Sequence, residues 1–267
     1  SELMMAALAR TKPAKSNKYA VKRQGAKAVK KMEKMSDTYI LSPEDATMFR
    51  ALSARGNYLA QDRPDINFAT KELCRECSRP NRNSYQRLKR LGRYLIGKPR
   101  LVYKYDWGTS APGADTLEIF VDTDFAGCKE TRRSTSGGLC FLNGSNIKSW
   151  AKTQTTLALS SGEAELHGIC AGIAQGLGLQ SVARDLGFQY DICIHTDATA
   201  AIGMCRRRGM GKLRHLDVTD LWCQEKVRTG AVSLVKIAGA DNPADMMTKY
   251  VPREILETMM KTSKLTA

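Results

Sequence analysis

The stretch TLEIFVD at residues 116–122 decides the fold, because it is an apolar run that ends in a carboxylate. Runs of this kind are typical of strands buried on both faces of a sheet. A second predicted strand, DICIHTD at 191–197, also ends in aspartate. In open α/β sheets, sites are built at the carboxyl ends of parallel strands. The pattern therefore predicts that Asp122 and Asp197 meet at one edge of a sheet.

The segments around these strands predict a mixed-sheet α/β domain at 116–250. The segment SGGLCFLNGSNIKSWAK at 136–152 is a predicted hairpin, because Asn-Gly is the strongest short-range hairpin signal. The other expected elements are helices at about 161–186, 198–207 and 215–228, a strand at 230–239 and a final helix from about Asn242. The domain is thus expected to contain five strands with helices between and after them.

Two glutamates open the helix expected after the third strand, in SSGEAEL. Positions two apart on a helix point to roughly opposite sides, so only one of Glu163 and Glu165 can face the strand ends. Ser160 stands three residues before Glu163, a capping-box spacing in which Glu163 reaches back to the N–H of the cap residue. Glu165 instead begins the apolar face that continues through Ile169. Glu165 is therefore the catalytic candidate.

Asp245, in DNPADMMTK, is a fourth acid at the start of the last predicted helix, where it can complete a second metal position. Each strand-end aspartate alone is better explained as a cap or turn residue, but the two together favour a metal site. Carboxylates a few ångströms apart repel, and their hard oxygen atoms select Mg²⁺ or Mn²⁺. The expected cofactor is two Mg²⁺ ions, with Mn²⁺ as a substitute.

The net charge of +15 is concentrated in the first third of the chain. Residues 1–35 carry +8 and residues 71–104 carry +9, whereas residues 107–267 carry only +1. Such asymmetry favours a polyanion partner, most simply nucleic acid. Lys-rich termini also serve solubility alone, and for residues 1–35 that alternative stays open.

The chain divides into five predicted regions, which are a basic flexible tail (1–36), a small basic helical segment (37–105), a linker (106–115), the α/β domain (116–250) and a C-terminal tail (251–267). In the helical segment, Ser42 and Pro43 predict a helix start. Further helices are expected at about 65–77 and 84–98. The last has a predicted apolar face of Leu88, Leu91 and Leu95, surrounded by Arg87, Lys89, Arg90 and Arg93.

Several classes of protein are excluded or disfavoured. No apolar run approaches the ~18–20 residues that a membrane span needs. The apolar start is followed by positive charges, which is the reverse of a secretory signal, so an intracellular protein of the cytoplasm or nucleus is expected. The spacing CREC at 74–77 resembles a metal site, but no second pair accompanies it, and two thiols on a helix are the preferred interpretation over zinc.

A family resemblance rests on four motifs in order: VDTDFAGCKETRRSTSGGLCFLNGSNIKSWAKTQTTLALSSGEAEL, IHTDATAAI, RHLDV and NPADMMTK. Together they resemble the ribonuclease H domain of copia-type long-terminal-repeat retrotransposon polyproteins. Residues 42–105 resemble the reverse-transcriptase thumb and connection of the same polyproteins. The resemblance implies a ribonuclease H-like mixed five-stranded sheet with flanking helices, an RNA–DNA hybrid as substrate and the polymerase part as a partner. It assigns the catalytic, metal-binding acids to Asp122, Glu165, Asp197 and Asp245.

Some residues depart from the family pattern. The chain has no two adjacent aspartates, so the Tyr-x-Asp-Asp turn of the polymerase is missing and polymerisation by this chain alone is not expected. Ala198 stands where relatives commonly have Ser or Asn, and KIAGADNPAD lacks the histidine of cellular ribonucleases H. His215 in LRHLDV matches a copia-type histidine, for which contact with the substrate and packing at a helix start both stay open.

The expected function is metal-dependent cleavage of the RNA strand of RNA–DNA hybrids. The candidates for contact with the nucleic-acid backbone are Arg132, Arg133, Ser134 and Asn143 on the loops flanking the first hairpin, and Arg87, Lys89, Arg90 and Arg93 on the basic helix. An integrase or transposase nuclease is a rival, but there the acids run Asp, Asp, Glu, whereas Glu165 is second here. An inactive or domesticated fragment that only binds nucleic acid stays open, as does the oligomeric state.

Overall fold

The computed structural model describes residues 39–105, 115–209 and 218–266, which form two compact units with separate hydrophobic cores. The first, the helical unit, ends at Leu101, and the second, the α/β unit, runs from Val102 to Thr266. The expected tail at 1–36 and nearly all of the expected linker lie outside the described residues.

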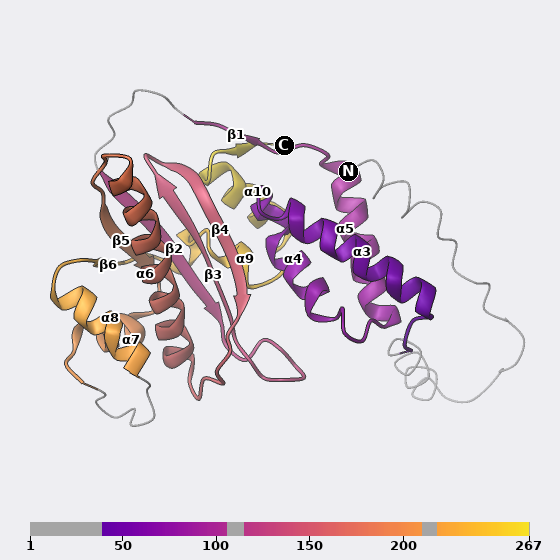
Figure 1. The fold of residues 1–267 in the computed structure, drawn as a ribbon, viewed down its shortest axis with the longest axis horizontal. Helices are drawn as coiled ribbons and strands as arrows, with labels where there is room; N and C mark the ends of the chain where they lie inside the picture. The colour runs from indigo at the N-terminus through magenta and orange to yellow at the C-terminus, as the bar shows by residue number, and fades with distance from the viewer. Residues whose placement is uncertain (1–38, 106–114, 210–217, 267) are drawn as a thin grey trace, which may run out of the picture. The chain divides into compact units, whose positions relative to one another are not determined.

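The described part of the helical unit contains three helices: α3 (Pro43–Leu59), α4 (Pro64–Arg75) and α5 (Arg82–Gly97), seen in Figure 1. The Ser42 hydroxyl caps α3 by accepting the N–H of Asp45 at 3.1 Å, as the sequence predicts. Asn81 and Ser84 cap α5 through a reciprocal capping box. The apolar face predicted for α5 is confirmed, because its three members are buried in the core: Leu88, Leu91 and Leu95.

A five-stranded mixed sheet forms the centre of the α/β unit, with the strand order β4-β3-β2-β5-β6. Its strands are β2 (Thr116–Asp124), β3 (Thr135–Leu142), β4 (Ser145–Thr153), β5 (Asp191–Thr196) and β6 (Ser233–Lys236). β2 pairs antiparallel with β3 and parallel with β5, so the carboxyl ends of β2 and β5 lie at one edge. The predicted α/β class and the parallel pairing of the two strands are confirmed.

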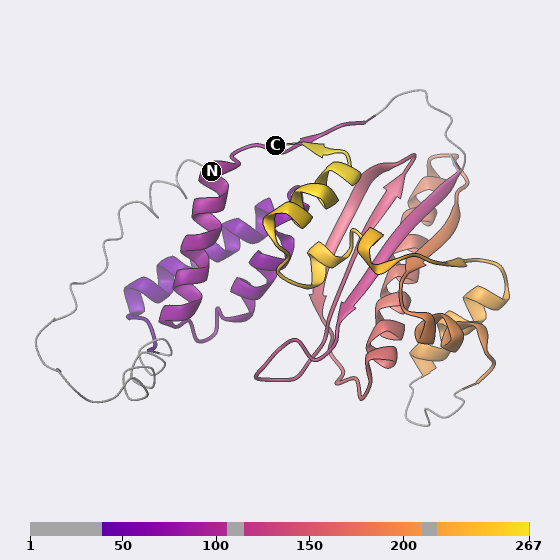
Figure 2. The ribbon, with the colours of Figure 1, turned by 180° about the vertical axis from the view of Figure 1, so that it is seen from behind.

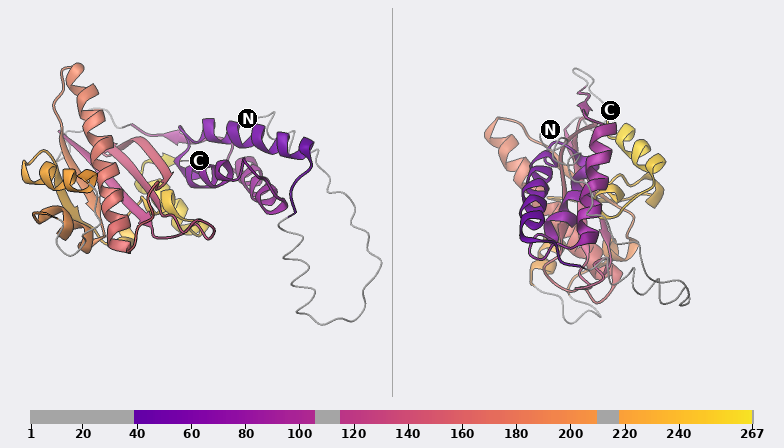
Figure 3. Two further views of the ribbon diagram at one scale, coloured as in Figure 1. Left: turned by 60° about the horizontal axis from the view of Figure 1, so that its bottom comes forward. Right: turned by 90° about the vertical axis from the view of Figure 1, so that its right-hand side faces the viewer.

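Helices cover both faces of this sheet (Figures 1 and 2). One face is covered by α6 (Ser161–Asp185), α7 (Thr199–Arg206) and α8 (Val218–Arg228), and the other by α9 (Asp245–Thr248) and α10 (Arg253–Thr262). Figure 3 shows α6 and the C-terminal helices from two further directions. Helices α6 and α9 both reach the acid-bearing edge of the sheet, by which we mean the carboxyl ends of β2 and β5, where Asp122 and Asp197 lie. The helix α6 starts there, and α9 packs beside β3 and β2.

The predicted hairpin turn is confirmed. Asn143 and Gly144, between β3 and β4, have φ angles of 52° and 69°. Two consecutive positive φ angles are the geometry of a type I′ turn, which matches the twist of the flanking strands. The turn sets the register of β3 against β4, in which Leu142 lies opposite Ser145.

The C-terminal boundary of the domain was predicted wrongly. Residues 251–267 do not form a simple tail, because α10 buries Met259 and Met260 and β7 (Leu265–Thr266) pairs with β1 (Val102–Tyr103). The α/β unit therefore includes residues on both sides of the expected 116–250. The helix expected from about Asn242 begins instead at Asp245, because η1 (Gly239–Asp241) and a turn precede the four-residue α9. Within the described ranges, no helix has both the length and the apolar character of a membrane span.

Candidate active site

Three of the four predicted acids come together at the edge of the sheet. Asp122 lies near the end of β2, Asp197 directly follows β5, and Glu165 lies in the second turn of α6. One carboxylate oxygen from each residue lies within 4.8 Å of those of the other two. The parallel pairing of β2 with β5 places the aspartates side by side, and the start of α6 brings the glutamate to them.

Asp122 is held in place from the opposite face of the sheet. Only 5% of the residue is exposed, and the Thr248 hydroxyl of α9 donates to its Oδ2 atom. Burial raises the pKa of Asp122, the hydrogen bond from Thr248 lowers it, and the charge of Asp245 raises it further. The first acid is thus oriented by a helix that lies more than 100 residues later in the chain.

Glu165 is the most strongly perturbed of the acids. Burial raises its pKa to about 8, and the charges of Asp122 and Asp197 add to the shift. Its Oε2 atom is buried and finds no hydrogen-bond partner among the described residues. A carboxylate oxygen in this position is costly unless a cation or a proton compensates it. The surroundings of Glu165 therefore fit a divalent cation.

Asp245 lies outside the group of three carboxylates but next to Asp122, and its carboxylate is paired with a lysine. Lys249 Nζ lies 2.8 Å from Asp245 Oδ1 and 3.9 Å from Asp122 Oδ2. Burial lowers the pKa of Lys249, but the hydrogen bond with Asp245 and the charge of Asp122 outweigh this and raise it. The lysine therefore carries its charge between the first and fourth acids, a role that no motif in the sequence predicts.

Asn242 anchors the segment that carries Asp245. It is fully buried, and its amide donates to the carbonyl of Val121 at 2.9 Å while accepting the N–H of Ala244 at 3.1 Å. Because Val121 directly precedes Asp122, this side chain ties the fourth acid to the strand of the first. Asn242 belongs to the NPAD motif, but the spacing of residues in the sequence does not predict its hydrogen bond to Val121 of β2.

Glu163 has the structural role that was predicted, with one difference. Its N–H donates to the hydroxyl of Ser160 at 3.2 Å, which is the expected cap. Its carboxylate accepts the N–H of Leu159 at 3.0 Å, one residue before the cap residue that was expected. Glu163 is 4% exposed and does not belong to the three-carboxylate group.

Gly239 makes room for the third acid. A Cβ atom added at this residue of η1 would lie only 2.8 Å from Oδ2 of Asp197. Ala198, which caps α7, offers no side-chain hydrogen bond to that helix. The backbone of η1 therefore lies close to Asp197. A single glycine in a loop does not predict this contact from the sequence.

The four loop candidates for nucleic-acid contact do not lie together. Arg132 and Arg133 are exposed between β2 and β3, at the acid-bearing edge. Ser134 was chosen wrongly, because it is fully buried and its hydroxyl accepts the N–H of Ala126 at 3.1 Å. Asn143 lies at the opposite edge of the sheet, since its neighbour Leu142 pairs with the start of β2.

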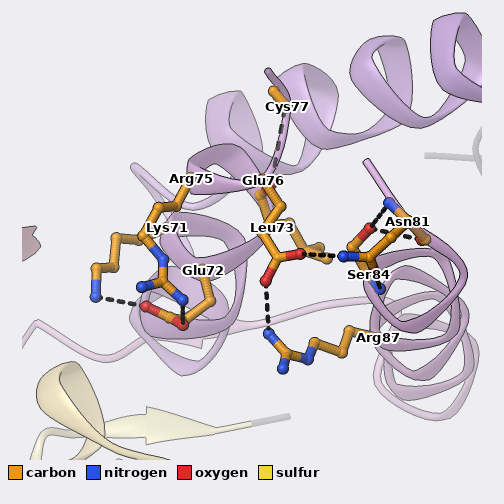
Figure 4. A network of polar contacts seen from close by, with 9 residues as sticks. All are labelled: Lys71, Glu72, Leu73, Arg75, Glu76, Cys77, Asn81, Ser84 and Arg87. Carbon is orange, nitrogen blue, oxygen red and sulfur yellow. Dashed lines mark hydrogen bonds and ion pairs between the residues drawn. The ribbon is translucent and has the colours of Figure 1, made fainter. Parts of the chain in front are cut away.

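The four candidates on α5 have different surroundings. Arg87 donates to Glu76 at 3.0 Å, within the polar network of Figure 4. Lys89 lies over the ring of Tyr85, 5.1 Å from its centroid. Arg90 and Arg93 are exposed. The last two are thus best placed to meet a phosphate, and Arg87 is engaged in holding α5 to α4.

His215 and the CREC segment were also singled out in the sequence. His215 lies outside the described residues. Cys74 and Cys77 are free thiols that donate to backbone carbonyls, and across the described ranges the only group of potential metal ligands is the acidic one.

Comparison with curated proteins finds polyproteins of transposons. No family model matches the chain. A retrovirus-related Pol polyprotein from transposon TNT 1-94 of Nicotiana tabacum is 30% identical over 197 residues, covering 73% of this chain. A retrovirus-related Pol polyprotein from transposon RE1 of Arabidopsis thaliana is 28% identical over 214 residues, covering 78% of this chain. The chain spans 14% of the length of each of these polyproteins.

A comparison with solved structures finds ribonucleases H. The crystal structure of LC11-RNase H1 in complex with RNA/DNA hybrid has 12% sequence identity and a TM-score of 0.35, covering 50% of this chain and 94% of that one. The α/β unit contains the expected five-stranded mixed sheet with flanking helices. The chain is therefore similar, over most of its length, to a short portion of Pol polyproteins of copia-type retrotransposons.

Proposed function

We propose that the α/β unit is a metal-dependent endonuclease that hydrolyses the RNA strand of RNA–DNA hybrids, as the C-terminal part of a copia-type reverse transcriptase. The observation that carries the proposal is the buried Glu165 oxygen, which finds no hydrogen-bond partner in the described ranges and belongs to a tight group with Asp122 and Asp197. Three carboxylates so close repel one another unless a cation lies among them.

The donor set fits Mg²⁺ or Mn²⁺, because all of its atoms are carboxylate oxygens. Asp122, Glu165 and Asp197 would hold one ion, and Asp122 with Asp245 would hold a second. When bound, such a pair of ions activates a water molecule and stabilises the leaving 3′ oxygen. Thr248 orients Asp122, and Lys249 compensates the charge of Asp245.

Substrate recognition is proposed to use the sugar-phosphate backbone. Arg132 and Arg133 are exposed at the acid-bearing edge, and Arg90 and Arg93 are exposed on α5. Contacts to 2′-hydroxyl groups in the shallow groove would identify the RNA strand.

The polymerase part of the same polyprotein is the proposed partner, and the cytoplasm or nucleus is the proposed location, because the substrate forms where reverse transcription takes place.

A substrate panel tests this proposal. The full chain is incubated with Mg²⁺ and with an RNA–DNA hybrid, an RNA duplex or a DNA duplex, each labelled on one strand. We expect cleavage of the RNA strand of the hybrid alone, and its loss in chelator. Binding of the hybrid without cleavage would select the inactive-fragment alternative, and transfer of DNA ends would select the integrase alternative.

A further inference from the structure

Gln154 connects three parts of the domain through one side-chain amide. It follows β4 and is 9% exposed. Its Nε2 atom donates to the carbonyl oxygen of Ala164 at 2.8 Å and to the hydroxyl of Ser136 at 2.7 Å. Its Oε1 atom lies 3.4 Å from Nδ1 of His167. Both N–H groups of the amide are therefore used inside the protein.

The partners of Gln154 lie next to the proposed metal ligands. Ala164 directly precedes Glu165 in α6. Ser136 Oγ lies 3.5 Å from Oγ1 of Thr123, the residue that follows Asp122 in β2. A continuous path of polar contacts thus runs from the backbone beside one acid to the side chain beside another.

The contact with Ala164 is not needed to cap the helix. Ser160 and Glu163 already satisfy N–H groups at the start of α6. A carbonyl inside a helix accepts from the residue four positions later and has a second lone pair for another donor. Gln154 supplies that second donor from outside the helix. The side chain of Gln154 therefore joins the start of α6 to the segment after β4 and to β3, and does not stabilise the helix along its own axis.

The path lies where α6 approaches the sheet most closely near the acids. A Cβ atom added at Gly168 would lie 2.5 Å from Oγ1 of Thr123 and 3.8 Å from Oγ of Ser136. The backbone of α6 therefore rests directly on the side chains of β2 and β3 at this point. A small shift of the helix would move Glu165 relative to Asp122, since Glu165 lies less than one turn before Gly168.

We propose that Gln154 is a positioning residue, which holds the start of α6 against β2 and β3 and so keeps Glu165 within ligand distance of Asp122. This inference rests on the proposed function, because the position of Glu165 matters only if the acids bind metal. Outer residues that orient metal ligands typically change metal affinity or activity by about 10–100-fold when they are replaced.

The chain offers a matched control on the same helix. Gln180, near the other end of α6, also donates from Nε2 to a backbone carbonyl, that of Tyr190, at 2.7 Å. Gln180→Leu therefore removes the same kind of hydrogen bond far from the acids. Gln154→Leu removes the whole connection, and Gln154→Glu keeps the size of the side chain while removing the donors to Ala164 and Ser136.

The experiment measures Mg²⁺ binding by calorimetry on the full-length chain, together with urea unfolding and the kinetics of hybrid cleavage. We expect both Gln154 variants to bind Mg²⁺ about tenfold more weakly and to lose kcat with little change in KM. We expect Gln180→Leu to lose stability while its Mg²⁺ affinity and kcat stay at the wild-type values.

Three outcomes would overturn the inference. Wild-type Mg²⁺ affinity in folded Gln154→Glu would do so while leaving the proposed function intact. An equal loss of Mg²⁺ affinity in Gln180→Leu would show that general loosening of α6 explains the effect. If the wild-type chain itself binds no Mg²⁺, the proposed function fails and the inference fails with it.

Discussion

Glu163 and Glu165 lie two positions apart on α6 and have different surroundings. The carboxylate of Glu163 accepts a backbone N–H before the helix, whereas an oxygen of Glu165 is buried without a partner among the described residues. Position on the helix separates them, because residues two apart point in different directions. One glutamate therefore stabilises the helix start and the other is available to a metal ion.

The first prediction uses this difference. Glu163→Gln keeps an oxygen acceptor for the Leu159 N–H, so its stability and its cleavage activity should stay close to wild type. Glu163→Ala should lose about 1 kcal/mol of unfolding free energy and remain active. Glu165→Gln should be folded but inactive. Urea unfolding and hybrid cleavage are measured on all three, and an inactive Glu163→Gln beside an active Glu165→Gln would contradict the site.

At the scale of elements, the close approach of α6 to β2 depends on glycine. Gly168, Gly172 and Gly176 recur at every fourth position, and an added Cβ at Gly172 would lie 2.6 Å from Cγ1 of Val121. Hydrophobic periodicity predicts the buried face through Ile169 and Ile173, both fully buried. The glycines give no apolar signal, so the closeness of the packing was not predicted.

The second prediction compares two glycines of this helix. Gly172→Ala should destabilise the α/β unit by about 1–3 kcal/mol, because the methyl group overpacks the contact with β2. Gly178→Ala should be neutral or stabilise it by up to about 1 kcal/mol, because nothing lies within 4 Å of the added Cβ and alanine favours helix. Thermal unfolding checks both, and equal effects would show that α6 packs differently.

The third prediction concerns pH and the helical unit. The Tyr94 hydroxyl donates to Asp65 at 2.7 Å. Burial raises the pKa of Tyr94 above its usual value of 10, and the charge of Asp65 adds to the shift. Since the folded protein keeps the proton that the unfolded chain loses, this stabilisation is complete below pH 10 and is lost as pH rises beyond it.

Chemical unfolding at pH 9 and pH 11 measures this effect. The wild-type chain should lose more unfolding free energy over that interval than Tyr94→Phe, which has no proton to release. At pH 9 the variant should be about 1 kcal/mol less stable, because Asp65 loses one hydrogen bond and keeps those from Arg63. An identical pH dependence in the two proteins would contradict the role of Tyr94.

At the scale of the whole molecule, the positive charge of residues 71–104 contrasts with the near-neutral residues 107–267. The fourth prediction is that α5 binds the hybrid backbone without reading sequence. Each phosphate neutralised contributes a slope of about 0.9 in log affinity against log salt. Replacing Arg87, Lys89, Arg90 and Arg93 with Gln should flatten this slope and raise KM, with little change in kcat, because the contacts are equal in ground and transition states.

A control separates charge from folding. Arg87→Gln alone breaks the ion pair with Glu76, so it should cost stability while changing the salt slope little. Arg90→Gln with Arg93→Gln should carry most of the change in slope, because both residues are exposed. Binding is measured by fluorescence anisotropy from 50 to 200 mM salt. An unchanged slope in the quadruple variant would show that α5 does not hold the hybrid.

The sequence predicted the strands, the hairpin and the convergence of Asp122, Glu165 and Asp197, because local periodicity and strand ends carry those signals. Contacts between distant segments could not be predicted in this way. The pairing of β1 with β7 joins two residues at each end of the α/β unit, and two-residue strands have no periodicity. Lys249 and Thr248 act on Asp122 only because α9 packs on β3 beside it.

The central claim is that the acids at the edge of the sheet form a metal-dependent active site. The most direct measurement is Mg²⁺-dependent cleavage of the RNA strand of a hybrid by the wild-type chain and by Asp122→Asn, with hybrid affinity and near-ultraviolet circular dichroism as controls. The account predicts that Asp122→Asn keeps its fold and its hybrid affinity while cleavage falls to background. Cleavage by folded Asp122→Asn at the wild-type rate would contradict it.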